Sequence, residues 1–174
     1  MGLALFVVTS DGYLVFSRRS ENRRIRTGEY DCSIVEGLKP IVNDYSIYDD
    51  DYLVNECKRA FEEEVCTHFD GSRTILHGVV LDRAYGQWNA IGTIETPLTS
   101  KEISHLHSVR NDTYEKNDLF MVPVLNGDTF ESSNLRMCLK RFRRVGFWDM
   151  ALTALYATLR YLGAADDDLA GLLE

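Results

Sequence analysis

Residues 51–65 combine a helical pattern of apolar side chains with a run of carboxylates at one end. The apolar positions recur at helical spacing and are Leu53, Cys57, Ala60, Phe61 and Val65. This spacing predicts a helix with one buried face. Three consecutive acids, Glu62–Glu64, fall in its last turns, where the partial negative charge of a helix end opposes them. A bound divalent cation would reverse that penalty.

The same segment resembles the signature of the Nudix hydrolase family, G-x5-E-x7-R-E-U-x-E-E-x-G-U, in which U is a bulky aliphatic residue. When Arg59 is aligned with the signature arginine, Glu63 and Glu64 fall on the paired acids and Asp51 on the upstream acid. A register one residue earlier pairs Lys58-Arg59 with the Arg-Glu step and Glu62-Glu63 with the paired acids. The first register is preferred because it keeps the arginine and puts Phe61 on the apolar position.

The resemblance implies a fold and a reaction. The fold is an α/β/α sandwich with a mixed sheet, and the reaction is attack of a water, activated by Mg²⁺ or Mn²⁺, on a diphosphate that is linked to another group, typically a nucleoside. Such chemistry needs cations, oxygen ligands and a base. By resemblance, Glu63 and Glu64 hold the metal and Arg59 orients carboxylates through salt bridges. Glu115, in the loop before a later strand, is a further candidate ligand.

The signature departs from the family at Ala60, Cys66 and Thr67. The first change matters most, because the family usually has a metal ligand or general base there and an alanine side chain is neither. Glu56 lies four residues earlier on the same helix face and is the candidate substitute. One helical turn, about 5.4 Å, separates the two positions, which is a large displacement for catalytic geometry.

Three interpretations therefore remain open. The first is a metal-dependent hydrolase of a nucleoside-diphosphate-linked compound, with Glu56, Arg59, Glu63 and Glu64 as catalytic residues. The second is a Nudix-like module that binds a nucleotide without hydrolysing it. The third is a protein-interaction domain. The missing acid at Ala60 separates the first two.

Charge and aromatic residues give weaker indications about the ligand. Arg18, Arg23 and Arg26 are candidates for phosphate contacts, and Trp88, or else Tyr85, for stacking on a base or ribose. The net charge is −8, which argues against general affinity for nucleic acid. The expected ligand is thus a small nucleotide-type molecule.

The remaining sequence predicts an α/β chain. Strands are expected at 3–9, 13–18, 30–35, 75–81, 88–94 and 119–124, and helices at 51–65, 100–109, 135–142 and 147–162. Segment 38–50 is an insertion relative to the signature. We expect one domain, 1–174, with 128–174 as a helical C-terminal extension of it.

Cysteine spacing and hydropathy bear on location. The four cysteines form no Cys-x-x-Cys pair, so neither a zinc site nor a disulfide framework is indicated. The apolar start, residues 3–8, is too short for a membrane span. We therefore expect a cytoplasmic protein without membrane partners, and the apolar final helix leaves a homodimer open.

Overall fold

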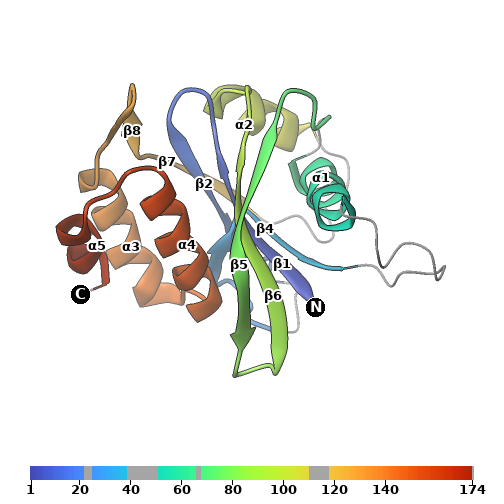
Figure 1. The fold of residues 1–174 in the computed structure, drawn as a ribbon. Helices are drawn as coiled ribbons and strands as arrows, with labels where there is room; N and C mark the ends of the chain where they lie inside the picture. The colour runs from blue at the N-terminus through green and yellow to red at the C-terminus, as the bar shows by residue number, and fades with distance from the viewer. Residues whose placement is uncertain (22–24, 39–50, 66–67, 110–117, 174) are drawn as a thin grey trace.

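A mixed β-sheet lies between two helical layers (Figure 1). The computed structural model describes residues 1–21, 25–38, 51–65, 68–109 and 118–173. Helices α1 (Tyr52–Val65) and α2 (Ser100–Ser108) belong to one side, and α3 (Ser133–Val145), α4 (Asp149–Tyr161) and α5 (Asp166–Leu173) to the other. The predicted α/β/α sandwich is confirmed. No described helix is long and apolar enough to cross a membrane.

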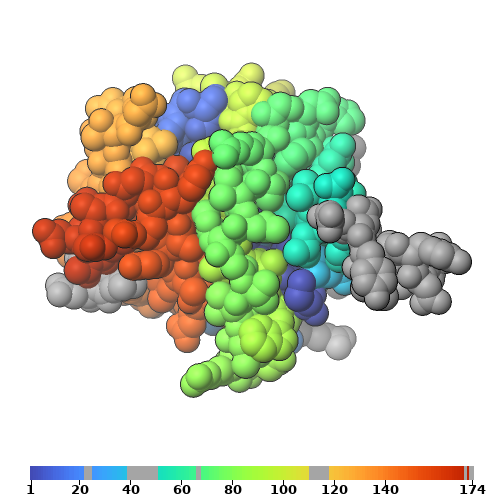
Figure 2. All heavy atoms as spheres, in the orientation of Figure 1, coloured from blue at the N-terminus to red at the C-terminus, as the bar shows by residue number. Residues whose placement is uncertain are grey.

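The seven-stranded sheet is organised around its first strand. β1 pairs in parallel with β6 and antiparallel with β2 and β4, while β3 and β7 extend the sheet from β2 and β5 forms an edge beyond β6. The strands are β1 (Gly2–Val8), β2 (Tyr13–Arg18), β3 (Tyr30–Cys32), β4 (Ile34–Gly37), β5 (Arg73–Asp82), β6 (Gln87–Glu95) and β7 (Asp118–Pro123). A small separate ladder joins β8 (Leu125–Asn126) and β9 (Thr129–Phe130). The β5–β6 hairpin reaches the surface between α4 and α1 (Figure 2).

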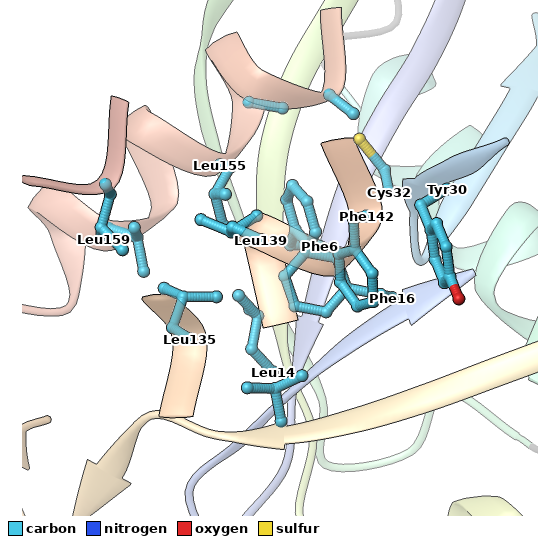
Figure 3. Packing of buried hydrophobic residues seen from close by; sticks show 14 of the residues in the cluster. Phe6, Leu14, Phe16, Tyr30, Cys32, Leu135, Leu139, Phe142, Leu155 and Leu159 are labelled. Atoms are coloured by element: carbon cyan, nitrogen blue, oxygen red, sulfur yellow. The ribbon is translucent and has the colours of Figure 1, made fainter. Parts of the chain in front are cut away.

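All seven residues of β1 are buried, because successive side chains enter different cores. Phe6 belongs to the core beneath α3–α5, where Phe16 lies 5.2 Å from it and 5.1 Å from Phe142, measured between ring centroids (Figure 3). Tyr30 stacks on the other side of Phe142 at 3.9 Å. The second layer is therefore anchored by aromatic packing.

The other core lies beneath α1 and α2. Leu3, Leu5 and Val7 of β1 pack with Cys57, Ala60 and Phe61 of α1 and with Ile103 of α2. Ala60 and Phe61 are fully buried, as the apolar spacing of this segment predicts. The opposite face of α1 is thereby turned away from the sheet.

A single serine joins the strands where β1 and β2 diverge. Ser33, between β3 and β4, accepts a hydrogen bond from the backbone N–H of Val7 at 2.7 Å and donates one to the carbonyl of Val15 at 2.5 Å. All three residues are buried. The hydroxyl thus satisfies one group on each diverging strand, and β4 begins from this point.

Ser33→Ala is expected to destabilise the protein by about 1–3 kcal/mol, because it leaves a buried N–H and a buried carbonyl without their partner. The measurement is chemical denaturation of both proteins at pH 7. Ser108→Ala, which removes an exposed serine hydroxyl, is the control and is expected to change stability by less than about 0.5 kcal/mol. Equal effects of the two variants would show that the strand junction does not depend on Ser33.

Candidate active site at α1 and β4

The carboxylates of α1 that the structure brings together are those of Glu56 and Glu63. Both lie on one face of the helix with Arg59, because positions three and four apart in a helix are neighbours. Arg59 donates to Glu56 Oε2 through Nη2 at 3.0 Å and to Oε1 through Nε at 3.3 Å. Its Nη1 donates to Glu63 Oε2 at 2.5 Å. One guanidinium therefore joins two carboxylates.

Arg59 also connects the helix with the sheet. Its Nη2 donates to the carbonyl oxygen of Gly37, the last residue of β4, at 3.3 Å. Hydrogen bonding to Glu56 is the largest cause that raises the pKa of Arg59, with Glu63 and Glu36 acting in the same direction and partial burial against it. The end of β4 is thus part of the same electrostatic unit as the acidic face of α1.

Glu56 is the more enclosed of the two acids. Its side chain is 11% exposed and that of Glu63 is 48% exposed. The substitution at Ala60 thus coincides with a largely buried acid one turn earlier. Glu62 is used otherwise, since its Oε1 accepts from the backbone N–H of Phe69 at 3.1 Å, beyond the end of the helix.

The donor atoms fit a hard divalent cation. No three His, Cys, Asp or Glu side chains in the described part of the chain are grouped as a metal cage. Mg²⁺, however, is usually held by one or two carboxylates together with waters and the phosphates of a substrate. Glu56 and Glu63, with the nearby Gly37 carbonyl, supply oxygen donors of that kind.

A pocket of about 230 Å³ includes the end of β4 in its lining. Glu36 and Gly37 line it, and Gly37 is also the residue whose carbonyl accepts from Arg59. The remaining lining residues are Arg19, Ile25, Arg26, Val35, Tyr85, Gln87 and Trp148. A ligand in this pocket meets two arginines, a tyrosine that is 50% exposed and the β4 end.

A stack of Arg26 on Trp148 forms one wall of this pocket. The guanidinium carbon lies 3.9 Å from the ring centroid, and Nη1 donates to Asp31 at 2.8 Å. Arg26 has φ +54°, a left-handed conformation that costs a side-chain-bearing residue about 1–2 kcal/mol. Non-glycine residues keep such a conformation where the surrounding structure fixes it, often at ligand sites.

Trp148 in turn fixes the turn between β5 and β6. Its indole N–H donates to Asp82 at 2.9 Å, and the other oxygen of Asp82 accepts from the N–H groups of Ala84 and Tyr85. Arg26, Tyr85 and Trp148 also line a second pocket of about 230 Å³ with Glu29, Asp82 and Asp149. Arg26, Tyr85 and Trp148 are therefore shared by a pocket that also has Arg19 and a pocket that has three carboxylates.

The structure distributes the predicted site residues unevenly. Arg26 lines the pocket. Arg18 instead bonds the Gly28 carbonyl and Glu21, both at 2.9 Å. Trp88 is 54% exposed on β6 and is not part of the lining of either pocket described above. Glu64 is half-buried on α1, and Arg23 and Glu115 lie outside the described residues.

Most of the pocket lining, including Arg19, was not predicted from the sequence. Trp148 falls in the segment 147–162, which is predicted only as a helix, and it reaches the core as well. Glu36 and Gln87 carry no sequence signal, since a polar residue at a strand end is common on any surface. Only the pairing of β4 and β6 with β1 brings them to one pocket.

One comparison with a solved structure supports the fold. No family model and no curated protein matches the sequence. Among solved structures, DR0079 from Deinococcus radiodurans is similar, with a TM-score of 0.56 and 13% identity over 90% of this chain and 81% of that one. A MutT protein from Methanosarcina mazei Go1 has a TM-score of 0.45 and 18% identity over 82% and 91%. At 13% identity, the likeness to DR0079 concerns the fold and not the activity.

Asp31 is the buried acid behind the pocket arginines. Burial raises its pKa to about 6, although Arg26, Arg19 and the N–H of Cys32 favour the carboxylate. Arg19 Nη1 lies 3.8 Å from it. A folded-state pKa above the unfolded value means that the folded protein binds the extra proton. The contribution of Asp31 to stability is therefore present near pH 4 and is lost as the pH rises through about 6.

Asp31→Asn is expected to remove this pH dependence. The melting temperature of the variant minus that of the wild type should be more positive at pH 7.5 than at pH 4.5, and thermal melts at both pH values measure it. Asp128→Asn, at an exposed position, is the matched control. Its melting temperature relative to the wild type is expected to be the same at both pH values. A difference for Asp31→Asn that is constant, or more positive at pH 4.5, contradicts the assignment.

Proposed function

We propose that this protein binds a nucleoside-diphosphate-linked compound in the pocket lined by Arg19, Arg26 and Tyr85 and hydrolyses it with Mg²⁺ or Mn²⁺. The observation that supports this most is the position of the β4 end. Gly37 lines the pocket and also bonds Arg59, which holds both carboxylates. A diphosphate in the pocket therefore lies beside the acidic face of α1.

The lining suggests how the ligand is held. Arg19 and Arg26 offer donors to phosphate oxygens, and Asp31 balances part of their charge from behind. Tyr85 presents an exposed ring to a base or ribose. Glu36 adds a carboxylate to the lining.

Glu56 and Glu63 would hold the cation, with Glu64 as the further acid from the resemblance. A bound divalent cation offsets phosphate charge and lowers the pKa of a water. Glu56 takes the place of the absent acid at Ala60 in this proposal, and Arg59 bonds both carboxylates. A cytoplasmic location and a homodimer remain predictions from the sequence.

A second candidate function is ligand binding without hydrolysis. It is favoured by the burial of Ala60 in the core and by the pairing of both oxygens of Glu56 with Arg59. A sensor needs the pocket but not a free base. Turnover separates the two functions.

Glu63→Gln is expected to abolish hydrolysis while the protein still binds the ligand. Loss of a residue that only hydrogen-bonds to a metal ligand lowers activity by about 10–100-fold. Loss of a proposed ligand itself should lower the activity by at least as much. Release of phosphate or nucleotide is measured over a panel of nucleotide sugars, dinucleotides and dNTPs with Mg²⁺ or Mn²⁺. Glu131→Gln, at an exposed position, is the control. Binding without turnover in the wild type would favour the sensor.

Tyr85→Ala is expected to weaken ligand binding by about fivefold, since an exposed aromatic stack contributes about 1 kcal/mol. Protein stability should not change, because the ring is half exposed. Titration calorimetry with the best ligand of the panel measures the effect. Tyr156→Ala removes a ring of similar exposure, 43%, on α4. Equal effects of the two tyrosines would exclude this pocket as the base or ribose site.

A further inference from the structure

Arg59 occupies the point at which the oxygen donors of α1 and β4 meet. Its guanidinium bonds both oxygens of Glu56, one oxygen of Glu63 and the carbonyl of Gly37. Two carboxylates and a backbone carbonyl form the kind of ligand set that a hard divalent cation uses in proteins. Here a positively charged side chain from the same helix already holds these atoms.

We propose that Arg59 is the resident cation of this site and competes with the divalent cation for the same oxygens. This rests on the proposed function for the place of the metal. It reverses the part that the family resemblance gives to the arginine. An arginine that only orients the carboxylates promotes metal binding, whereas an arginine that occupies their oxygens opposes it.

The shared oxygens support competition. Both oxygens of Glu56 and one oxygen of Glu63 already accept from Arg59, so a divalent cation that binds these oxygens must displace the guanidinium from them. A phosphate group that enters the pocket offers Arg59 new acceptors, so Arg59 can then leave its carboxylates for the phosphate. Gly37 bonds Arg59 and also lines the pocket, so Arg59 borders the place where the phosphate is proposed to bind. The metal and the diphosphate should therefore bind cooperatively, each weakly alone.

The test measures direct Mn²⁺ binding in the absence of nucleotide. The readout is the loss of the electron paramagnetic resonance signal of free Mn²⁺ as the ion binds to the protein. Arg59→Gln should bind Mn²⁺ at least about tenfold more tightly than the wild type, a change of about 1.4 kcal/mol. The double variant Glu56→Gln with Arg59→Gln should lose this gain. Arg73→Gln is the control, since Arg73 is 72% exposed on β5 and lies 4.0 Å from Glu95.

Affinity for Mn²⁺ that is unchanged or lower in Arg59→Gln overturns the proposal and supports the orienting role. Turnover plays no part in this readout. A protein that hydrolyses nothing but gains Mn²⁺ affinity keeps the inference and loses the proposed function. A protein that hydrolyses compounds of the panel but binds Mn²⁺ equally with and without Arg59 keeps the proposed function and loses the inference.

If Arg59→Gln does not fold, the wild type still provides a test. The Nε–H resonance of Arg59, identified by its absence in Arg59→Lys, reports the hydrogen bond to Glu56. Addition of Mg²⁺ together with a non-hydrolysable nucleoside diphosphate analogue should shift it, because Arg59 exchanges partners. A resonance that stays unchanged when both ligands are saturating excludes the exchange.

Discussion

The burial of β1 on both faces is the constraint from which the architecture follows. A strand with two apolar faces needs a cover on each side, and Phe6 and Leu5, one residue apart, enter different cores. The amphipathic segment 52–65 supplies one cover, and the C-terminal helices supply the other. The acidic face of α1 is then left pointing away from the core, where the Glu63 side chain is 48% exposed. The acidic residues of the candidate site are thus on the outer face of α1 because the apolar face of this helix covers β1.

The electrostatics of α1 explain how such an acidic face is tolerated in the folded chain. Glu63 lies near the negative end of the helix dipole, and Glu56 is largely removed from water, so both need a cation. Arg59 provides one from within the helix, at positions that neighbour both acids. The bond to Gly37 adds a tertiary contact, so the same interaction that makes the acids tolerable also places them beside the pocket. The charge balance of the acidic face and its contact with the β4 end therefore depend on the same guanidinium.

Residue periodicity predicted most of the elements, because local spacing determines helices and strands. β2 was predicted at its observed bounds, and α1 began one residue later than expected. The segment 30–35 was predicted as one strand, but Ser33 divides it into β3 and β4, since its side chain bonds two other strands. α5 was not predicted, because its acidic first turn shows no apolar periodicity.

The pairing of Glu56 with Glu63 through Arg59 follows from helical spacing, whereas the pocket does not. Trp148 and Gln87 are 61 residues apart in sequence by their numbers and meet only through the sheet.

The C-terminal helices have a larger part in the site than an extension would suggest. Trp148, at the start of α4, supports the Arg26 guanidinium on its ring and holds the β5–β6 turn through Asp82. The adjoining Phe147 pairs with Tyr30 at an isolated bridge, which attaches the same segment to β3. In the proposed function the pocket arginines bind phosphate, and a fixed support favours this because flexible arginines lose about 2 kcal/mol of rotamer entropy when they are ordered. Trp148, at the start of α4, provides that support without a bound ligand. The layer of α3–α5 thus contributes to the pocket, and the layer of α1 and α2 carries the acids.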